Sequence, residues 1–126
     1  MSDPIVGVAA GEPVTVKLSF QGIANHYEAS LYAPKPGTSQ WMLVRTLETD
    51  GSSEDARPDE FTFDPPAVGA SRLFVFQSAM TAAVVPGDVG VTARVEQRGE
   101  DRGEVPVTGH VTTFVEVVLR LLVVAS

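Results

Sequence analysis

The stretch Pro13–Phe20, with the sequence PVTVKLSF, decides the fold class of this chain. Apolar and polar residues alternate along it: Val14, Val16, Leu18 and Phe20 against Thr15, Lys17 and Ser19. A period of two sends successive side chains to opposite faces of a β-strand, so one face is expected to be buried and the other hydrated. The same alternation returns in Tyr27–Ala33 and in Asp88–Gln97, which indicates an all-β chain.

Three further segments have strand character with less regular patterns. Gln40–Leu47 and Arg72–Gln77 are apolar on both faces, which predicts central strands that are covered on two sides. Glu60–Asp64 is typical of a short strand with Phe61 and Phe63 turned inward. Each of these segments adds a strand to the alternating ones.

The structure of two other segments stays open at this point. Val105–Val124 is long and rich in β-branched residues, and it predicts either one bent strand or two strands. Gln77–Val85 predicts either a single helical turn or an extended loop. A turn is expected at Pro36-Gly37, and Gln97–Glu104 is expected to form a hairpin loop with a charged tip.

Seven or eight strands at short spacing, separated by glycine and proline, predict an all-β fold built as a sandwich or barrel. We interpret residues 1–126 as a single antiparallel β-sandwich domain, immunoglobulin-like or jelly-roll-like in its general architecture. The length suits one domain, and a chain of this size buries a core without covalent cross-links.

The composition excludes several classes of function. The chain has no cysteine, which rules out disulfides, thiolate zinc sites and a cysteine nucleophile. Its formal net charge is −7, and its nine Lys and Arg residues are scattered along the sequence. The chain therefore lacks the basic surface that nucleic acids and anionic membranes attract, and we expect neither as a partner.

The apolar segments near the two ends predict a soluble, cytoplasmic protein. No basic region precedes the mildly apolar Ile5–Ala10, although a signal peptide would require one. The apolar run Phe114–Ala125 is shorter than the roughly 20 residues that a membrane-spanning helix needs. This run also contains Glu116 and Arg120. The absence of cysteine fits a reducing compartment.

The acidic stretch Leu47–Pro66 raises the question of a calcium site. Its seven carboxylates belong to Glu48, Asp50, Glu54, Asp55, Asp59, Glu60 and Asp64. Calcium takes about six to eight oxygen ligands, but the spacing of these acids does not match a calcium-binding EF-hand loop. We interpret the stretch as a hydrated connection between strands that holds no metal and no cofactor. Calcium binding is the alternative.

No catalytic constellation is evident in the sequence. The two histidines are His26, near the start of a strand, and His110, which alternates with Thr112 and Phe114 on one face. The chain contains no G-x-S-x-G nucleophile elbow, no H-E-x-x-H motif and no glycine-rich phosphate loop. We therefore predict that the protein is not an enzyme, and we assign no catalytic residue.

The carboxy-terminal segment has the most informative surface pattern. One face by parity belongs in a core: Val111, Thr113, Val115, Val117, Leu119, Leu121 and Val123. The other face mixes charged and large apolar side chains, and it supplies the candidate interface residues: Phe114, Glu116, Val118, Arg120 and Leu122. A bare stripe of this kind is an aggregation hazard. It is expected to be covered by a partner subunit, with Glu116 and Arg120 fixing the register, or by the chain's own loops or first strand.

These features favour a non-enzymatic interaction or assembly module that acts through protein–protein contacts and forms homo-oligomers. The alternative is a lectin-like module that binds carbohydrate or another small ligand, with or without calcium. Sugar binding would use exposed aromatic side chains, and the candidates are Tyr32 and Trp41. Tyr32 lies on the polar side of its strand, whereas Trp41 lies in an apolar run that is more typical of a core.

Overall fold

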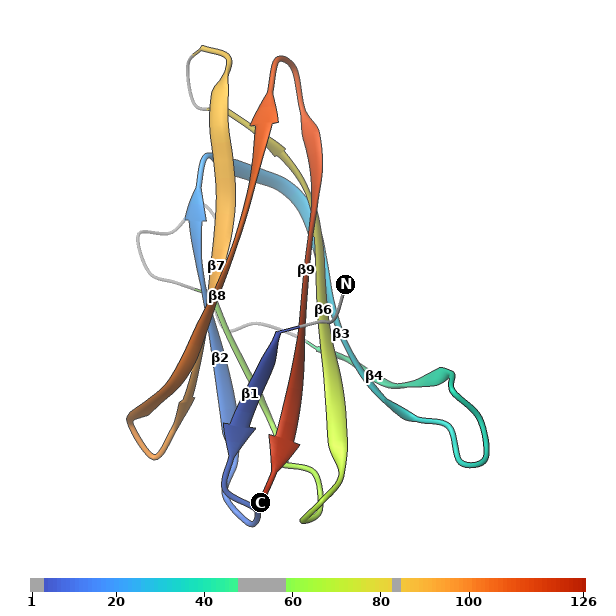
Figure 1. The fold of residues 1–126 in the computed structure, drawn as a ribbon. Helices are drawn as coiled ribbons and strands as arrows, with labels where there is room; N and C mark the ends of the chain where they lie inside the picture. The colour runs from blue at the N-terminus through green and yellow to red at the C-terminus, as the bar shows by residue number, and fades with distance from the viewer. Residues whose placement is uncertain (1–3, 48–58, 83–84) are drawn as a thin grey trace.

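Every regular element in the residues that the structure describes is a β-strand (Figure 1). The computed structural model describes residues 4–47, 59–82 and 85–126. These residues form nine strands: β1 (Ile5–Val8), β2 (Val14–Gln21), β3 (Ile23–Pro34), β4 (Trp41–Leu47), β5 (Asp59–Phe63), β6 (Ser71–Thr81), β7 (Gly87–Gln97), β8 (Glu100–Val111) and β9 (Val115–Ala125). In the described part of the chain, no helix has the length and apolar character needed to cross a membrane.

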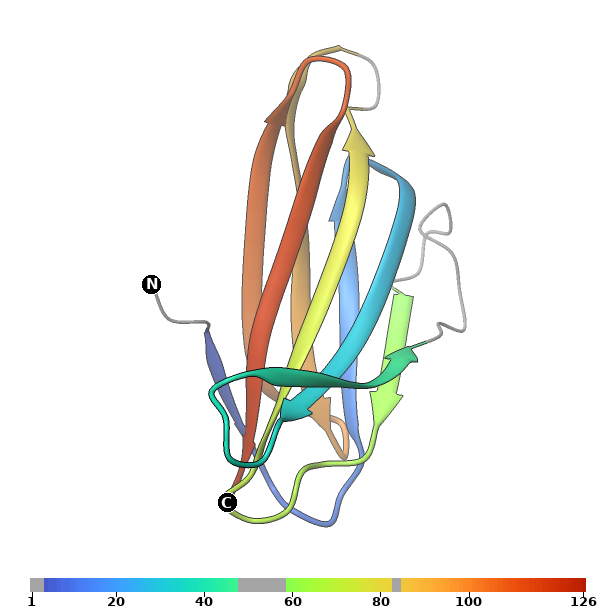
Figure 2. The same ribbon diagram turned by 90° about the vertical axis from the view of Figure 1, so that its right-hand side faces the viewer.

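The nine strands form a sandwich of two sheets (Figures 1 and 2). The five-stranded sheet has the order β1-β9-β6-β3-β4, and the four-stranded sheet has the order β5-β2-β7-β8. Neighbouring strands pair antiparallel except β1 and β9, which pair parallel. The predicted all-β sandwich is therefore confirmed, with one or two more strands than the sequence predicts.

The period-two pattern sets the core between the sheets. Val14, Val16 and Leu18 of β2 are fully buried, as their alternation predicts. Aromatic rings join the two layers: the ring centroids of Phe61 in β5 and Phe74 in β6 lie 5.9 Å apart. This inward position of Phe61 confirms the short strand predicted at Glu60–Asp64.

The segment Val105–Val124 contains two strands rather than one bent strand. β8 ends at Val111 and β9 begins at Val115, so a short turn lies between them. β8 belongs to the four-stranded sheet and β9 to the five-stranded sheet, so this turn links the two layers at one end of the sandwich (Figure 1).

The prediction of a helical turn or an extended loop at Gln77–Val85 is wrong for the described residues, because β6 continues to Thr81. The physical reason is that burial keeps its period of two through Phe76, Ser78 and Met80, which are all buried. β6 is also the central strand of its sheet, which confirms the position predicted for Arg72–Gln77.

The prediction that Gln40–Leu47 forms a central strand is wrong, because β4 is an edge strand of the five-stranded sheet. Leu43 is 56% exposed, and only Leu47 among the β4 residues is buried. The register with β3 shifts after Leu31, where a β-bulge leaves Val44 as the extra residue. A bulge bends a strand pair, and the end of the β3–β4 hairpin projects from the face of the sheet (Figures 1 and 2).

A two-residue loop connects β7 to β8. Gln97 pairs with Glu100, so Arg98 and Gly99 form the whole connection. Both have positive φ, 54° and 79°, as a type I′ hairpin turn requires. The hairpin predicted at Gln97–Glu104 is confirmed, but the loop is shorter because β8 already begins at Glu100.

A buried amide joins the amino-terminal strand to this hairpin. Gln97 is buried, with 1% of its surface exposed. Its Nε2 donates hydrogen bonds to the carbonyl oxygens of Ala9 (2.7 Å) and Glu12 (3.0 Å), and its Oε1 accepts one from the N–H of Ala9 (2.8 Å). Gln97 therefore fixes the connection between β1 and β2 against the end of β7.

Replacing this amide should destabilise the fold. We expect Gln97→Ala to lower the free energy of unfolding by about 2–4 kcal/mol, because it leaves buried backbone groups without their partners. The measurement is urea-induced unfolding monitored by circular dichroism. The matched control is Gln77→Ala on the exposed outer face of β6, which should stay within about 0.5 kcal/mol of the wild type. Equal effects of the two substitutions would contradict the assigned role of Gln97.

Candidate functional site

The outer face of the four-stranded sheet carries ion pairs across its strands. Lys17 Nζ lies 3.3 Å from Glu96 Oε2 and 3.6 Å from Glu60 Oε1. These three side chains come from β2, β7 and β5, so the pairs cross two strand boundaries. Exposed ion pairs add little to stability, but they show that this face is hydrated.

Arg94 continues the same pattern toward β8. Its Nη2 lies 3.1 Å from Glu104 Oε2, and its Nε lies 3.6 Å from Asp101 Oδ2. The hydrogen bond and the charge of Glu104, with a smaller contribution from Asp101, raise the pKa of the Arg94 guanidinium above its ordinary value. This face is thus occupied by charges of both signs that already have partners within the chain.

The outer face of the five-stranded sheet is different, and β9 shows the difference most clearly. Inward and outward residues alternate along β9 as the sequence predicts, with the inward side chains buried: Val117, Leu119, Leu121 and Val123. Glu116, Val118 and Arg120 point outward and are exposed, and Val118 keeps 38% of its surface accessible. Phe114, in the turn before β9, is 66% exposed.

An apolar row crosses all five strands on this face. The strand register places side by side, in order, Ile5, Leu122, Leu73, Tyr32 and Leu43. The two end members are exposed, whereas Leu73 is 2% exposed although it lies outside the main core cluster. The outward stripe of β9 therefore continues into apolar surface at both edges of the sheet.

The chain's own first strand covers one part of the candidate interface. β1 pairs with Leu122–Ala125 of β9, and Leu122 is half-buried. The other candidate residues lie beyond the reach of this pairing: Phe114, Glu116, Val118 and Arg120 are all exposed. Covering by the first strand, one of the two expectations, thus applies to the end of β9 alone.

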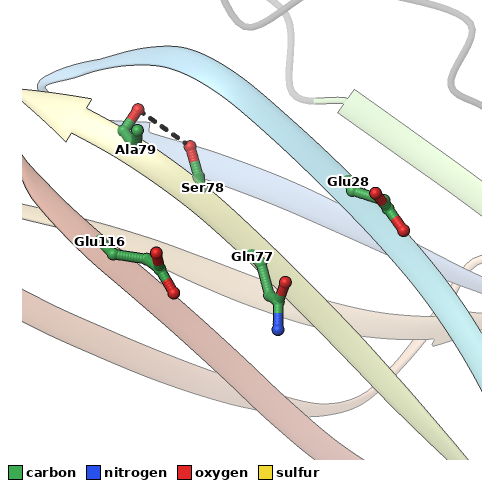
Figure 3. Close-up of a pocket in the computed structure, with 5 residues that line it drawn as sticks. All are labelled: Glu28, Gln77, Ser78, Ala79 and Glu116. Atoms are coloured by element: carbon green, nitrogen blue, oxygen red, sulfur yellow. Dashed lines mark hydrogen bonds between the residues drawn. The ribbon is translucent and has the colours of Figure 1, made fainter.

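A shallow hollow of about 150 Å³ lies on the same face (Figure 3). It is lined by Glu28 of β3, Glu116 of β9 and, from β6, Gln77, Ser78 and Ala79. The Ser78 hydroxyl donates a hydrogen bond to the Ala79 carbonyl oxygen (3.3 Å). The hollow offers two carboxylates and an amide, but it is smaller than the roughly 300–1,000 Å³ of typical ligand pockets.

The structure describes only part of the acids and histidines that the sequence singles out. In the acidic stretch, residues 48–58 lie outside the described residues, and Glu60 pairs with Lys17. His110 Nδ1 lies 3.2 Å from Asp88 Oδ1 at an exposed position, and the side chain of His26 is outside the described part. Within residues 4–47, 59–82 and 85–126, no three such groups are placed to hold a metal ion.

The two aromatic candidates for sugar binding both belong to the β3–β4 hairpin. Tyr32 is half-buried between Leu73 and Leu43 in the apolar row. Trp41 pairs with Pro34 and is half-buried, so it does not occupy the core position that its apolar surroundings predict. Sequence patterns missed this projecting hairpin, because the bulge that produces it has no signature in the residues themselves.

Comparison with known proteins gives the fold and nothing on function. No protein-family model matches the chain, and no curated protein matches it either. A solved structure with a similar fold is the crystal structure of a domain of unknown function, DUF4425, from Bacteroides vulgatus. The likeness covers 91% of this chain and 97% of that chain, with a TM-score of 0.53 at 5% identity. At this identity the likeness concerns the two-sheet architecture alone.

The edge position of β4 leads to a direct test. We expect Leu43→Lys to change the free energy of unfolding by less than about 1 kcal/mol, because the side chain is exposed on an edge strand. Leu47→Ala, in the same strand, should cost about 2–5 kcal/mol, because Leu47 is buried in the core. Chemical denaturation of both variants at low protein concentration is the measurement. A large loss for Leu43→Lys would place β4 inside the sheet.

Proposed function

We propose that this chain is a non-enzymatic interaction module that assembles with copies of itself through strand β9 of its five-stranded sheet. The observation that carries the proposal is the exposed stripe of apolar and charged residues on β9: Phe114, Glu116, Val118 and Arg120. The opposite face of the sandwich supports it by contrast, because none of the exposed large apolar residues in the described part of the chain belongs to its four strands. An immunoglobulin-like or jelly-roll-like class stays a prediction.

The amount of apolar surface on this sheet supports association with another protein surface. Besides the β9 stripe, the register places two further exposed large apolar residues on the outer face of the same sheet: Ile5 in β1 and Leu43 in β4. Removing such surface from water is favourable in proportion to its area. Apolar patches on a soluble domain mark sites of interaction more often than isolated apolar residues do.

Self-association can be tested by measuring solution mass. Size-exclusion chromatography with light scattering, over a hundredfold range of concentration, should show a defined multimer of the wild type. We expect Val118→Lys to be monomeric where the wild type is a multimer, because it places a charge at the centre of the stripe.

The matched control is Thr62→Lys, which adds the same charge to an exposed position on β5 in the other sheet. This variant should keep the mass of the wild type. A wild type that stays monomeric at every concentration would remove the proposal, and so would a Val118→Lys variant that assembles as the wild type does.

Carbohydrate binding is the second candidate, and the hollow beside Glu116 is the feature that favours it. Glu28, Gln77 and Glu116 provide the carboxylate and amide groups that hydrogen-bond to sugar hydroxyls. No aromatic residue lines this hollow, and its volume is small. A glycan screen with the wild type, repeated with Gln77→Ala, tests this candidate. Binding that survives the substitution would place any sugar elsewhere.

A further inference from the structure

Over much of its length, β9 has a described pairing partner on one side only. On one side it pairs with β6 from Val115 to Val124. On the other side it pairs with β1, but only over Leu122–Ala125 (Figures 1 and 2). Among the described strands, none pairs with Val115–Leu121 on that side.

β8 approaches this part of β9 from inside the sandwich. A Cβ atom on Gly109 of β8 would lie 3.5 Å from a methyl group of Val115 and 3.8 Å from one of Val117. Val117 is an inward residue of β9, so β8 packs against the inner face of β9 and belongs to the other sheet. β8 therefore does not form backbone hydrogen bonds with the edge of β9.

The backbone direction identifies the residues that face this edge. The N–H of Leu122 donates a hydrogen bond to the Pro4 carbonyl oxygen (2.8 Å), so the amide of Leu122 points toward the β1 side. Backbone groups of successive residues in a strand point to opposite neighbours. Since the register of β9 with β6 has no shift, Glu116, Val118 and Arg120 share the direction of Leu122. These three are also the outward residues of the stripe.

We infer that β9 pairs with β9 of a second copy of this chain, antiparallel and centred on Val118. The inference rests on the self-association proposed above and specifies its geometry. The open stretch Val115–Leu121 is symmetric about Val118, so a two-fold axis there pairs Val118 with Val118 of the partner subunit. The two five-stranded sheets then become one continuous sheet, and β1 of each copy lies beyond the end of the shared ladder.

The side chains of the stripe fit their own reversed copy. In chain order Phe114, Glu116, Val118, Arg120 and Leu122 are apolar, acidic, apolar, basic and apolar. Antiparallel pairing about Val118 places each Glu116 opposite an Arg120 of the partner subunit, whereas Phe114 and Leu122 lie outside the shared ladder because β1 occupies the edge at Leu122. Parallel pairing in register would place acid against acid and base against base. Directly opposite charges of unlike sign stabilise a strand pair, and like charges destabilise it.

Packing of the two sheets face to face is the competing arrangement, and Glu28 disfavours it. The register places Val118, Gln77 and Glu28 side by side across three strands. An antiparallel face-to-face dimer with its axis at Val118 would run that axis along this row and bring the two Glu28 carboxylates toward each other. Edge pairing keeps them at least two strands from the interface.

A single cysteine distinguishes the two arrangements, because the chain has none of its own. In edge pairing the two Cα atoms at position 118 lie about 5.5 Å apart, within disulfide range, whereas sheets packed face to face stand about 10 Å apart. We expect Val118→Cys to form a covalent dimer under mild oxidation, seen by non-reducing electrophoresis. The control Thr62→Cys, exposed on the other sheet, should not.

Covalent dimer from both variants, or from neither, would overturn the inference. If light scattering shows a wild-type multimer and Val118→Cys still does not cross-link, the edge geometry is wrong and self-association stands. If the wild type is monomeric throughout, the proposed function fails as well, so the two failures are distinguishable.

Charge exchange provides a second, independent test. Glu116→Arg alone and Arg120→Glu alone should each raise the dissociation constant tenfold or more, because each turns two attractive pairs into repulsive ones. An equimolar mixture of the two variants should form a heterodimer with wild-type affinity, and so should the double variant E116R/R120E with itself. Circular dichroism confirms that each variant is folded. Single variants that dimerise normally, or a mixture that stays monomeric, would contradict the antiparallel register.

Discussion

The burial of every second side chain between two facing sheets is the constraint on which this structure depends. It requires β2, β6, β7 and β9 to keep a strict inward set, and the core is made of those side chains. The same alternation leaves the remaining side chains on two outer faces, where burial no longer restricts them. One face carries ion pairs between its strands, and the other mixes exposed apolar residues with charged ones such as Glu28 and Glu116. The chemical contrast between the faces is therefore a separate feature of the sequence.

The sequence was sufficient for the properties that follow from periodicity. The inward residues of β2 and β9 and the central place of β6 are all visible as patterns of apolar residues. The exposure of Glu116, Val118 and Arg120 follows from the parity of β9 in the same way. The strand class and the outward stripe could be predicted because each depends on residues that are neighbours in one strand.

Properties that depend on the order of strands could not be predicted. Gln40–Leu47 is as apolar as a central strand, yet β4 lies at an edge and its register shifts at a bulge. Val115–Leu121 of β9 has no described strand on its outer edge because the pairing with β1 begins only at Leu122, and the local sequence of β9 gives no indication of this. The role of Gln97 could not be predicted for the same reason. Its amide contacts Ala9 and Glu12, which are far away in the chain, and a glutamine at a strand end does not by itself indicate such contacts.

The parallel pairing of β1 with β9 has a mechanical consequence. The first strand and the last strand run in the same direction, so tension applied at the beginning of β1 and at the end of β9 pulls the two strands past each other. Their hydrogen bonds are then loaded together in shear rather than opened one after another from an end. The Gln97 side chain also anchors the connection that follows β1, through its hydrogen bonds to the carbonyl oxygens of Ala9 and Glu12. A strand pair loaded in shear resists extension better than one that opens from an end.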